Sequence, residues 1–469
     1  MESPLRIGWI DPKQMVTAWD WRPIFHLSPA MYLERLGAHW SRLGGSAECL
    51  DGWRVSSNPA SVAYDERVEM APIYRMRHVG DTQLLTEAKH WEAPVVVGEP
   101  FCVRPNDVLV RKVGKVGAAP VNELHRRHPV DANVAIVRGL EPAMALWVAY
   151  CLNRPLYRAY LERLEGMTNL PRVGLKQLGS MPVAPPPAGF GEFARRYAQY
   201  LMDFDQAQDR LSRLRGEVGS WVGERFADYK DFMSLALDAR RWCRFEPEDL
   251  VEVLLISVME QRYLARRLRQ EGAALPLTKL ASVNPRHPTV EHEFGCKVLR
   301  ISDLDDHLGI ATHLAEREDV AWRVQRRPVK RFDVLVSTFA AESRVAFAAA
   351  SMGECVLPTE QLVTLCFHHH QGAYALLMES ALVQAQWQRL ATGSMQRFVP
   401  PASVRQLVMP VLDSVLAEEW HERLVEILTA RSKAQVNLQE AKQKMFDYYR
   451  SVHPAFEDEG LEAEQGVAW

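Results

Sequence analysis

The sequence lacks three features that would place a protein in a specialised class: a long apolar run, paired cysteines and a large excess of one charge. No stretch reaches the roughly 20 apolar residues that a membrane-spanning helix needs, and the N-terminus lacks the basic and then apolar layout of a secretory signal. The 7 cysteines stand singly, with no C-x-x-C pair. That spacing argues against a disulfide framework or a zinc site and is typical of a reducing cytoplasm. We expect no membrane contact.

Motifs for catalysis are missing as well. There is no G-x-x-x-x-G-K-[ST] phosphate loop and no [ND]-P-P-[YF] tetrapeptide, with which an adenine methyltransferase holds a flipped base; Asn284-Pro285 lacks the second proline and the aromatic residue. A nuclease-like D…E-x-K match at 81–89 is frequent by chance. Three adjacent histidines at 368–370 could bind a metal, but a solvated turn is favoured because they cannot all face one ion. We therefore expect no catalytic residue, no bound cofactor and no metal in this chain.

What the sequence does have is an ordinary globular composition with an uneven charge distribution. Its 469 residues, 47% hydrophobic and 25% charged, are enough for two to four domains. The net charge of −3 is low for a nucleic-acid-binding protein, but binding depends on where the charges lie. Acidic residues gather beyond 451, whereas basic residues gather in WRVQRRPVKR at 322–331. The average charge therefore hides a basic segment.

The two halves of the sequence match each other in order. Asp107 and Asp333 begin the same D-V-L-V segment at an offset of 226 residues. Other segments match at similar offsets, namely 57–61 with 283–287, 19–29 with 240–250, and 145–183 with 374–411. Within each half, the D-V-L-V segment predicts a short buried strand, and the runs 142–164 and 371–391 predict helices. The shared order predicts an internal repeat.

Each half ends in a long predicted helix with the same hydrophobic phase. Apolar positions from Phe193 to Trp221 alternate spacings of four and three, which is the a/d pattern of a coiled coil. Positions from Trp420 to Tyr448, with Arg431 as an imperfection, follow 227 residues later. The alternative is two amphipathic helices that each cover their own domain. At 1.5 Å per residue the first pattern spans about 43 Å, or roughly 13 base pairs of B-DNA.

These elements predict a mixed α/β (α+β) protein with an internal pseudo-twofold repeat of about 226 residues. Two similar domains are expected to be separated by two long antiparallel coiled-coil helices. The expected division is domain 1 at 1–188, a central helix at 189–232, domain 2 at 233–413, a C-terminal helix at 414–450 and an acidic tail at 451–469.

This layout resembles the specificity subunit of type I restriction-modification systems. The matching features are two D-V-L-V strands, each followed by a helix, a short loop (Gly166-Met167-Thr168 or Thr392-Gly393-Ser394-Met395-Gln396-Arg397), an apolar strand ending in proline, and a long helix. The first loop lacks the serine present at Ser394, so a related methylation-based phage-defence system is an alternative. The resemblance covers roughly 20–450.

The resemblance implies a non-catalytic subunit of the bacterial or archaeal cytoplasm. Such a subunit contains two target-recognition domains, reads a bipartite target in double-stranded DNA and positions a partner adenine-N6 methyltransferase. The partner is expected in two copies and holds the S-adenosylmethionine, and a restriction or translocase subunit is a further expected partner. Two other hypotheses stay open: a coiled-coil protein-interaction scaffold without DNA binding, and a self-contained nuclease or methyltransferase.

Candidate DNA-binding residues are the basic and amide side chains near the repeated strands. Lys and Arg contact phosphates, and Arg, Gln and Asn read base edges. The candidates are Arg111, Lys112, Lys115, Asn169, Arg172, Arg323, Arg326, Arg327, Lys330, Arg331, Arg344, Gln396 and Arg397. For the segment at 322–331 the alternative is a solvated basic strand edge. For Lys115 and its flanking glycines it is an ordinary hairpin turn, and for the loops at 169–172 and 396–397 it is helix capping.

Overall fold

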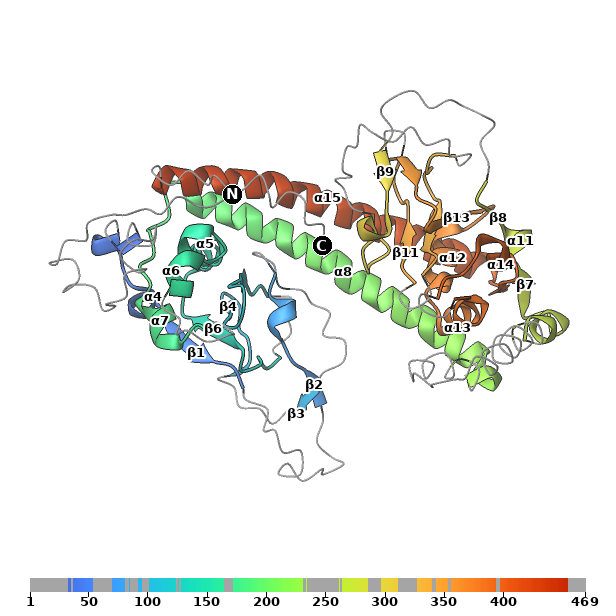
Figure 1. The fold of residues 1–469 in the computed structure, drawn as a ribbon, viewed down its shortest axis with the longest axis horizontal. Helices are drawn as coiled ribbons and strands as arrows, with labels where there is room; N and C mark the ends of the chain where they lie inside the picture. The colour runs from blue at the N-terminus through green and yellow to red at the C-terminus, as the bar shows by residue number, and fades with distance from the viewer. Residues whose placement is uncertain are drawn as a thin grey trace. The chain divides into compact units, whose positions relative to one another are not determined.

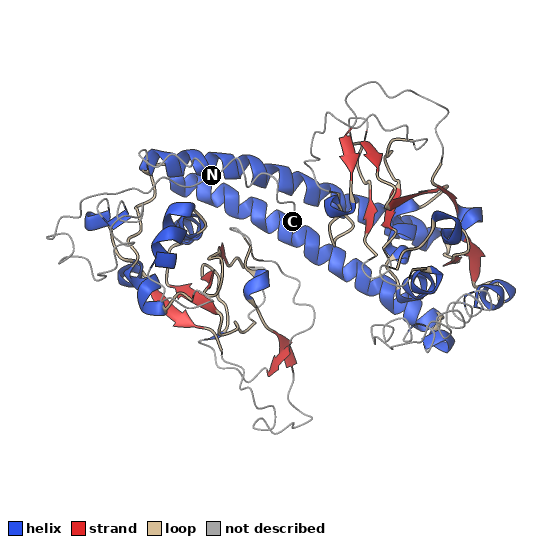
Figure 2. Cartoon of the chain, in the orientation of Figure 1, coloured by secondary structure: helices blue, strands red, loops and turns tan. Residues whose placement is uncertain are grey.

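The computed structural model describes most of the chain from residue 33 to residue 453. The described residues are 33–34, 37–53, 70–80, 84, 92–94, 101–123, 125, 128–163, 172–230, 233, 261, 264–285, 297–310, 327–339, 343–352, 356–393 and 397–453. The chain combines helices and sheets (Figures 1 and 2) and divides by its internal contacts into two units. Unit 1 consists of Met1–Asp205 and Asn437–Glu462, and unit 2 of Gln206–Val436 and Ala463–Trp469. The helices α8 (Phe190–Arg225) and α15 (Ser414–Val452) each contribute to both units.

Unit 1 is built on a four-stranded antiparallel sheet with the strand order β1-β6-β4-β5. Its strands are β1 (Glu48–Asp51), β4 (Val108–Arg111), β5 (Ala118–Pro120) and β6 (Val134–Arg138). The apolar helix α5 (Pro142–Leu152) packs on β4 and β5. The other elements are η1 (Gly37–His39), α4 (Leu43–Ser46), the paired strands β2 (Met70–Pro72) and β3 (Glu92–Pro94), η3 (Met76–His78), α6 (Pro155–Arg163) and α7 (Leu175–Ser180).

Unit 2 is built on a four-stranded antiparallel sheet with the order β11-β10-β13-β8. Its strands are β8 (Ala281–Val283), β10 (Val334–Ser337), β11 (Val345–Phe347) and β13 (Leu362–Phe367). Two helices, α12 (Gln371–Met378) and α13 (Ala381–Leu390), follow β13. The other elements are η5 (Ala227–Tyr229), the antiparallel pair β7 (Ala274–Pro276) and β14 (Val408–Pro410), α11 (Leu277–Leu280), the parallel pair β9 (Lys297–Leu299) and β12 (Val356–Pro358), η6 (Ile301–Asp303) and α14 (Pro401–Val404).

The two sheets have the same strand order. Each D-V-L-V strand, β4 or β10, lies between the strand that follows it in the sequence and the strand that leads into the helices. The runs 142–164 and 371–391 contain two helices each rather than one. In unit 1 the break falls at Asn153, whose amide group bonds both the N–H and the carbonyl of Ala118 in β5. Pro155 follows, and proline is tolerated only in the first turn of a helix.

A buried aspartate fixes the turn before each central strand. Asp107 is 1% exposed; its carboxylate accepts the backbone N–H of Arg104 at 2.8 Å and the guanidinium of Arg138 at 2.8 and 3.0 Å. The backbone of Asn106 is left-handed, with a φ of 68°. Asn tolerates this conformation better than most residues. The Asp107 carboxylate therefore accepts hydrogen bonds from a tight turn and from a half-buried guanidinium at the same time.

The same turn recurs in unit 2, with an arginine from a different place. Asp333 accepts the N–H of Lys330 at 2.7 Å and the guanidinium of Arg327 at 2.7 and 2.9 Å. Phe332 has a φ of 72° at the position that Asn106 holds in unit 1. Arg138 lies in β6, whereas Arg327 precedes the turn. The carboxylate is common to both units, and its cation is supplied by different elements.

The long helices contact each other within each unit. In unit 2, Trp221 packs edge to face on Trp420 at 5.6 Å between ring centroids, and Glu217 pairs with Arg423 at 2.6 Å. In these contacts, higher residue numbers of α8 meet lower residue numbers of α15, so the two helices are antiparallel there. In unit 1, Phe190 of α8 contacts Tyr448 near the end of α15. The predicted apolar positions of both helices are buried or half-buried.

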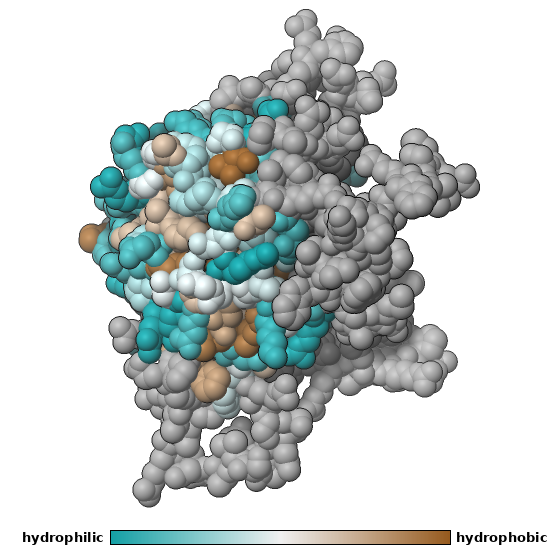
Figure 3. All heavy atoms as spheres, turned by 90° about the vertical axis from the view of Figure 1, so that its left-hand side faces the viewer, coloured by the Kyte–Doolittle hydropathy of each residue, from teal (hydrophilic) through white to brown (hydrophobic). Residues whose placement is uncertain are grey.

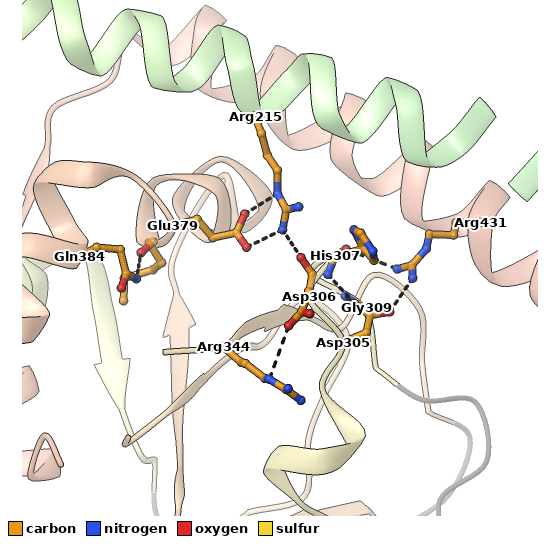
Figure 4. Close-up of polar contacts among 10 residues, drawn as sticks. Arg215, Asp305, Asp306, His307, Gly309, Arg344, Glu379, Gln384 and Arg431 are labelled. Carbon is orange, nitrogen blue, oxygen red and sulfur yellow. Dashed lines mark hydrogen bonds and ion pairs between the residues drawn. The ribbon is translucent and has the colours of Figure 1, made fainter. Parts of the chain in front are cut away.

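Arg431, the imperfection in the predicted apolar pattern, has a partner outside the helices. Its guanidinium donates to the Asp305 carboxylate at 2.6 Å, within unit 2 (Figure 4). The same carboxylate accepts the backbone N–H groups of His307 and Gly309. From α8, Arg215 forms a bidentate pair with Glu379 at 2.6 and 2.7 Å. Both long helices therefore hold the sheet domain of unit 2 through buried or half-buried arginines.

In unit 1 the corresponding connection to α8 is a buried carboxyl group. Asp205 accepts the Asn122 side-chain amide at 2.5 Å, and the His125 Nε2 atom lies 3.6 Å away. Burial raises the pKa of Asp205 to about 7, partly opposed by the Asn122 hydrogen bond. Burial also lowers the pKa of His125 to about 4. The pair therefore prefers its neutral forms in the folded protein.

We predict that Asp107→Ala destabilises the protein by roughly 3 kcal/mol, because it leaves the half-buried Arg138 guanidinium and the turn N–H without their carboxylate. Glu192→Ala removes an ion pair whose side chains are 66% and 67% exposed. This control should cost less than about 1 kcal/mol. Urea unfolding followed by circular dichroism measures both. Equal effects of the two substitutions would contradict a structural role for the turn.

We also predict that Asp205→Asn changes the pH dependence of stability. The unfolded carboxyl loses its proton near the ordinary aspartate pKa of 3.8, and the folded one near 7. Between these values the folded state holds the extra proton, so the parent loses stability as pH rises. Asn does not titrate, so the free energy of unfolding of Asp205→Asn should increase relative to that of the parent between these two pH values. The increase should be up to about 1.4 kcal/mol per pH unit. Above pH 7 the difference between the two proteins should stay constant. If the difference in unfolding free energy between the variant and the parent does not change with pH, the raised pKa of Asp205 is contradicted.

Candidate nucleic-acid interface

In unit 1 the hairpin between β4 and β5 is joined to the loop that precedes α7. Val113 forms a β-bridge with Arg172, and the N–H of Val173 donates to the Lys112 carbonyl at 2.8 Å. Gly114 turns the hairpin with a φ of 72°, a conformation that glycine adopts without strain. Two segments about 60 residues apart in sequence therefore meet at the end of the central strand.

Unit 2 repeats this junction. Phe339, just after β10, bridges Phe398, and the N–H of Val399 donates to the Thr338 carbonyl at 2.8 Å. Each of these partners lies 226 residues after its counterpart in unit 1. We call these two places the hairpin junctions, defined by Lys112–Lys115 with Arg172–Val173, and by Thr338–Phe339 with Arg397–Val399.

The hairpin junctions expose basic side chains. Lys115 and Arg172 are exposed in unit 1, and Arg397 is exposed in unit 2, where its guanidinium donates to the Gln388 carbonyl at 2.9 Å. Phe398 is 45% exposed, one of the few large apolar side chains among the described residues that reach the surface. The structure thus brings together Lys115 and Arg172, which the sequence placed in separate segments.

Two other basic residues of the first hairpin face inward. The Lys112 side chain is 3% exposed and its ammonium pairs with Asp51 of β1. The Arg111 guanidinium is half-buried and packs against Gly117, where a Cβ would lie 2.3 Å from its Nη2 atom. This geometry favours a structural role over a phosphate contact for both residues.

The basic segment of the second half lies at the opposite end of β10 from the hairpin junction. Lys330 and Arg331 are exposed there; the Arg331 guanidinium lies over the Phe332 ring at 4.4 Å and donates to the Ala349 carbonyl. Arg327 is held by Asp333, as described above. Arg323 and Arg326 lie outside the described residues.

The remaining candidates are Arg344, which the structure describes, and Asn169 and Gln396, which it does not. Arg344 is half-buried and donates to the Leu304 carbonyl at 3.0 Å, with Asp306 at 3.5 Å (Figure 4). That contact joins β11 to the loop held by Arg431 and favours a structural role. Asn169 and Gln396 lie outside the described residues.

Phe398 and Asp51 were not identified from the sequence. The repeat contained a signal for Phe398, because the 226-residue offset applied to Arg172 leads to position 398. No signal of that kind exists for Asp51, which pairs with Lys112 from a strand 61 residues away.

The histidines at 368–370 form the bend between β13 and α12. His368 and His369 are exposed, and the His370 Nδ1 atom pairs with Glu418 of α15 at 2.6 Å. Across the described ranges, no group of three or more His, Cys, Asp or Glu side chains is arranged to hold a metal ion. Within those same ranges, no helix is both long and apolar enough to cross a membrane. Among the described residues on the face drawn in Figure 3, hydrophilic side chains surround smaller groups of hydrophobic ones.

No protein-family model matches the sequence, and a search of curated proteins finds no match. Solved structures do resemble the chain. One is the S subunit of a type I restriction-modification system from M. genitalium, which is 11% identical with a TM-score of 0.37, the match covering 88% of this chain and 93% of that chain.

Two further structures resemble the chain over a similar length. One comes from work on complex assembly and conformational transition of the type I R-M system, at 13% identity and a TM-score of 0.25. The other is the HsdS subunit from Thermoanaerobacter tengcongensis, at 13% identity and a TM-score of 0.23. Each match covers 88% of this chain and 94% of the other.

We predict that the basic segment separates into a structural and a surface part. Arg327→Ala removes the cation that pairs with the buried Asp333 carboxylate and should cost roughly 3 kcal/mol. Lys330→Ala changes an exposed side chain and should stay within about 0.5 kcal/mol of the parent. Thermal unfolding at one pH distinguishes the two. The division is wrong if Lys330→Ala destabilises as much as Arg327→Ala.

Proposed function

We propose that the chain is the sequence-specific DNA-recognition subunit of a DNA-methylation complex, of the restriction-modification or phage-defence kind. The observation that carries this function is the hairpin junction, which occurs in both units and exposes Lys115 and Arg172 in one and Arg397 in the other. Lys and Arg supply phosphate contacts, and Arg also reads guanine in the major groove.

The two units serve as two copies of one recognition domain. Three shared features support this: the strand order of the sheets, the buried aspartate turn and the bridged hairpin junction. Two reading domains in one chain imply a bipartite target with an unread spacer. The long helices act as a coiled-coil spacer, and the 29-residue pattern in the sequence corresponds to a separation of roughly 13 base pairs.

Catalysis belongs to a partner. The chain lacks the motifs that hold a flipped adenine or a nucleotide phosphate. The resemblance to type I specificity subunits implies that a separate adenine-N6 methyltransferase, in two copies, supplies S-adenosylmethionine and the methyl transfer. A restriction or translocase subunit joins where the complex also cleaves DNA. The chain's own contribution is to place the methyltransferase at the target.

The test is salt-dependent binding of the full chain to duplex DNA. We predict that the triple substitution of Lys115, Arg172 and Arg397 by Ala weakens binding and lowers the log–log salt slope by about 0.9 for each phosphate that is no longer neutralised. A matched control replaces Arg196, Arg213 and Lys444, three exposed residues of the long helices, with the same change in charge. Fluorescence anisotropy across a salt series measures both slopes.

Two outcomes would contradict the proposal. If the control lowers the slope as much as the triple substitution, the hairpin junctions are not the interface. If the parent shows no salt-dependent binding to DNA, the protein-interaction scaffold is the better account of the repeat and its long helices.

A further inference from the structure

The two hairpin junctions present different side chains at one equivalent position. Arg172 in unit 1 and Phe398 in unit 2 each bridge the second residue after the central strand. Each is followed by a valine whose N–H donates at 2.8 Å to the carbonyl of the first residue after the strand, Lys112 or Thr338. The two positions therefore share one bridge and one backbone hydrogen bond, and their side chains differ in chemistry.

Both side chains are directed outward by the alternation of extended backbone. Val173 is 1% exposed and Val399 is 0% exposed, so they face the core. Successive side chains of an extended segment point to opposite sides, which turns Arg172 and Phe398 to the surface. The 45% exposure of Phe398 is the consequence.

Phe398 is also held rigidly. Its N–H donates to the Thr392 carbonyl, and its carbonyl accepts the Thr392 N–H, both at 2.8 Å. A side chain on a fixed backbone loses little additional freedom when it binds a partner. A benzene ring has no hydrogen-bonding group for a phosphate, so the partner that suits it is an apolar surface.

DNA offers one apolar group that differs between base pairs at the major-groove edge, the C5-methyl of thymine. The same groove presents O6 and N7 of guanine, two acceptors that match the planar fork of an arginine. One position in a repeated scaffold can therefore read guanine or thymine according to the side chain it carries.

We infer that Arg172 and Phe398 are equivalent base-reading residues: Arg172 selects a guanine in one half of the target, and Phe398 selects a thymine in the other half. This inference rests on the proposed function and deepens it. Lys115 and Arg397, beside them, supply the neighbouring phosphate contacts.

The first experiment identifies the target. The full chain is incubated with a library of randomised duplexes, and the bound fraction is sequenced. The parent should enrich a bipartite motif with a guanine in one half and a thymine in the other. Arg172→Ala should lose the guanine preference by on the order of tenfold and leave the other half unchanged. Phe398→Ala should lose the thymine preference and leave the half that contains the guanine unchanged.

The second experiment changes single groups on the DNA. In the selected duplex, 7-deazaguanine removes N7 from the read guanine, and deoxyuridine removes the methyl from the read thymine. The parent should bind each modified duplex several-fold more weakly. Arg172→Ala should be insensitive to the loss of N7, and Phe398→Ala should be insensitive to the loss of the methyl.

Control variants separate base reading from general surface effects. Arg196→Ala removes an exposed arginine of α8, and Val415→Ala removes an apolar side chain that is 75% exposed at the start of α15. Both should enrich the parent motif. A thermal unfolding curve like that of the parent shows that each variant is folded.

The outcomes also separate this inference from the proposed function. If the parent enriches a bipartite motif and both variants enrich the same motif, the inference about Arg172 and Phe398 is wrong, and the DNA-recognition function stands. If the parent enriches no motif, the proposed function fails and this inference fails with it. If each variant stays as sensitive as the parent to its modified base, the assigned contacts are wrong.

Discussion

The sheets of both units depend on one interaction, the buried carboxylate at the turn before the central strand. Asp107 and Asp333 each accept a backbone N–H of the turn and a guanidinium, and they are 1% and 4% exposed. A buried carboxylate needs both kinds of partner, because an unpaired charge in the interior is destabilising by several kcal/mol. In each unit the central strand begins directly after this aspartate. The hairpin junction lies at the opposite end of the same strand.

That constraint decides which arginines are available to a ligand. Arg138 and Arg327 neutralise the turn carboxylates, and Arg215 and Arg431 hold carboxylates of unit 2 against the long helices. In this arrangement the guanidinium group of each of these four arginines is paired with a carboxylate. The net charge of −3 is compatible with a basic surface at the hairpin junctions, because binding depends on the local charge, and Lys115, Arg172 and Arg397 are exposed there.

Sequence patterns predicted the central strands, the helical runs and the phase of the long helices, because those features follow from local periodicity. They could not separate structural from exposed cations. Asp107 takes its arginine from 31 residues downstream, and Asp333 takes the equivalent one from 6 residues upstream. Lys112 and Lys115 are three residues apart in one hairpin, yet the first is buried against Asp51 and the second is exposed. Tertiary partners of this kind leave no local pattern.

The central claim, that the hairpin junctions touch DNA, is tested most directly by photo-cross-linking. The full chain is bound to a duplex in which 5-bromodeoxyuridine replaces thymine, irradiated, digested and analysed by mass spectrometry. The account predicts cross-linked peptides that contain Lys115 or Arg172 from unit 1 and Phe398 from unit 2. Cross-links confined to the turn at Lys330 and Arg331, or to the helices α12 and α13, would contradict it.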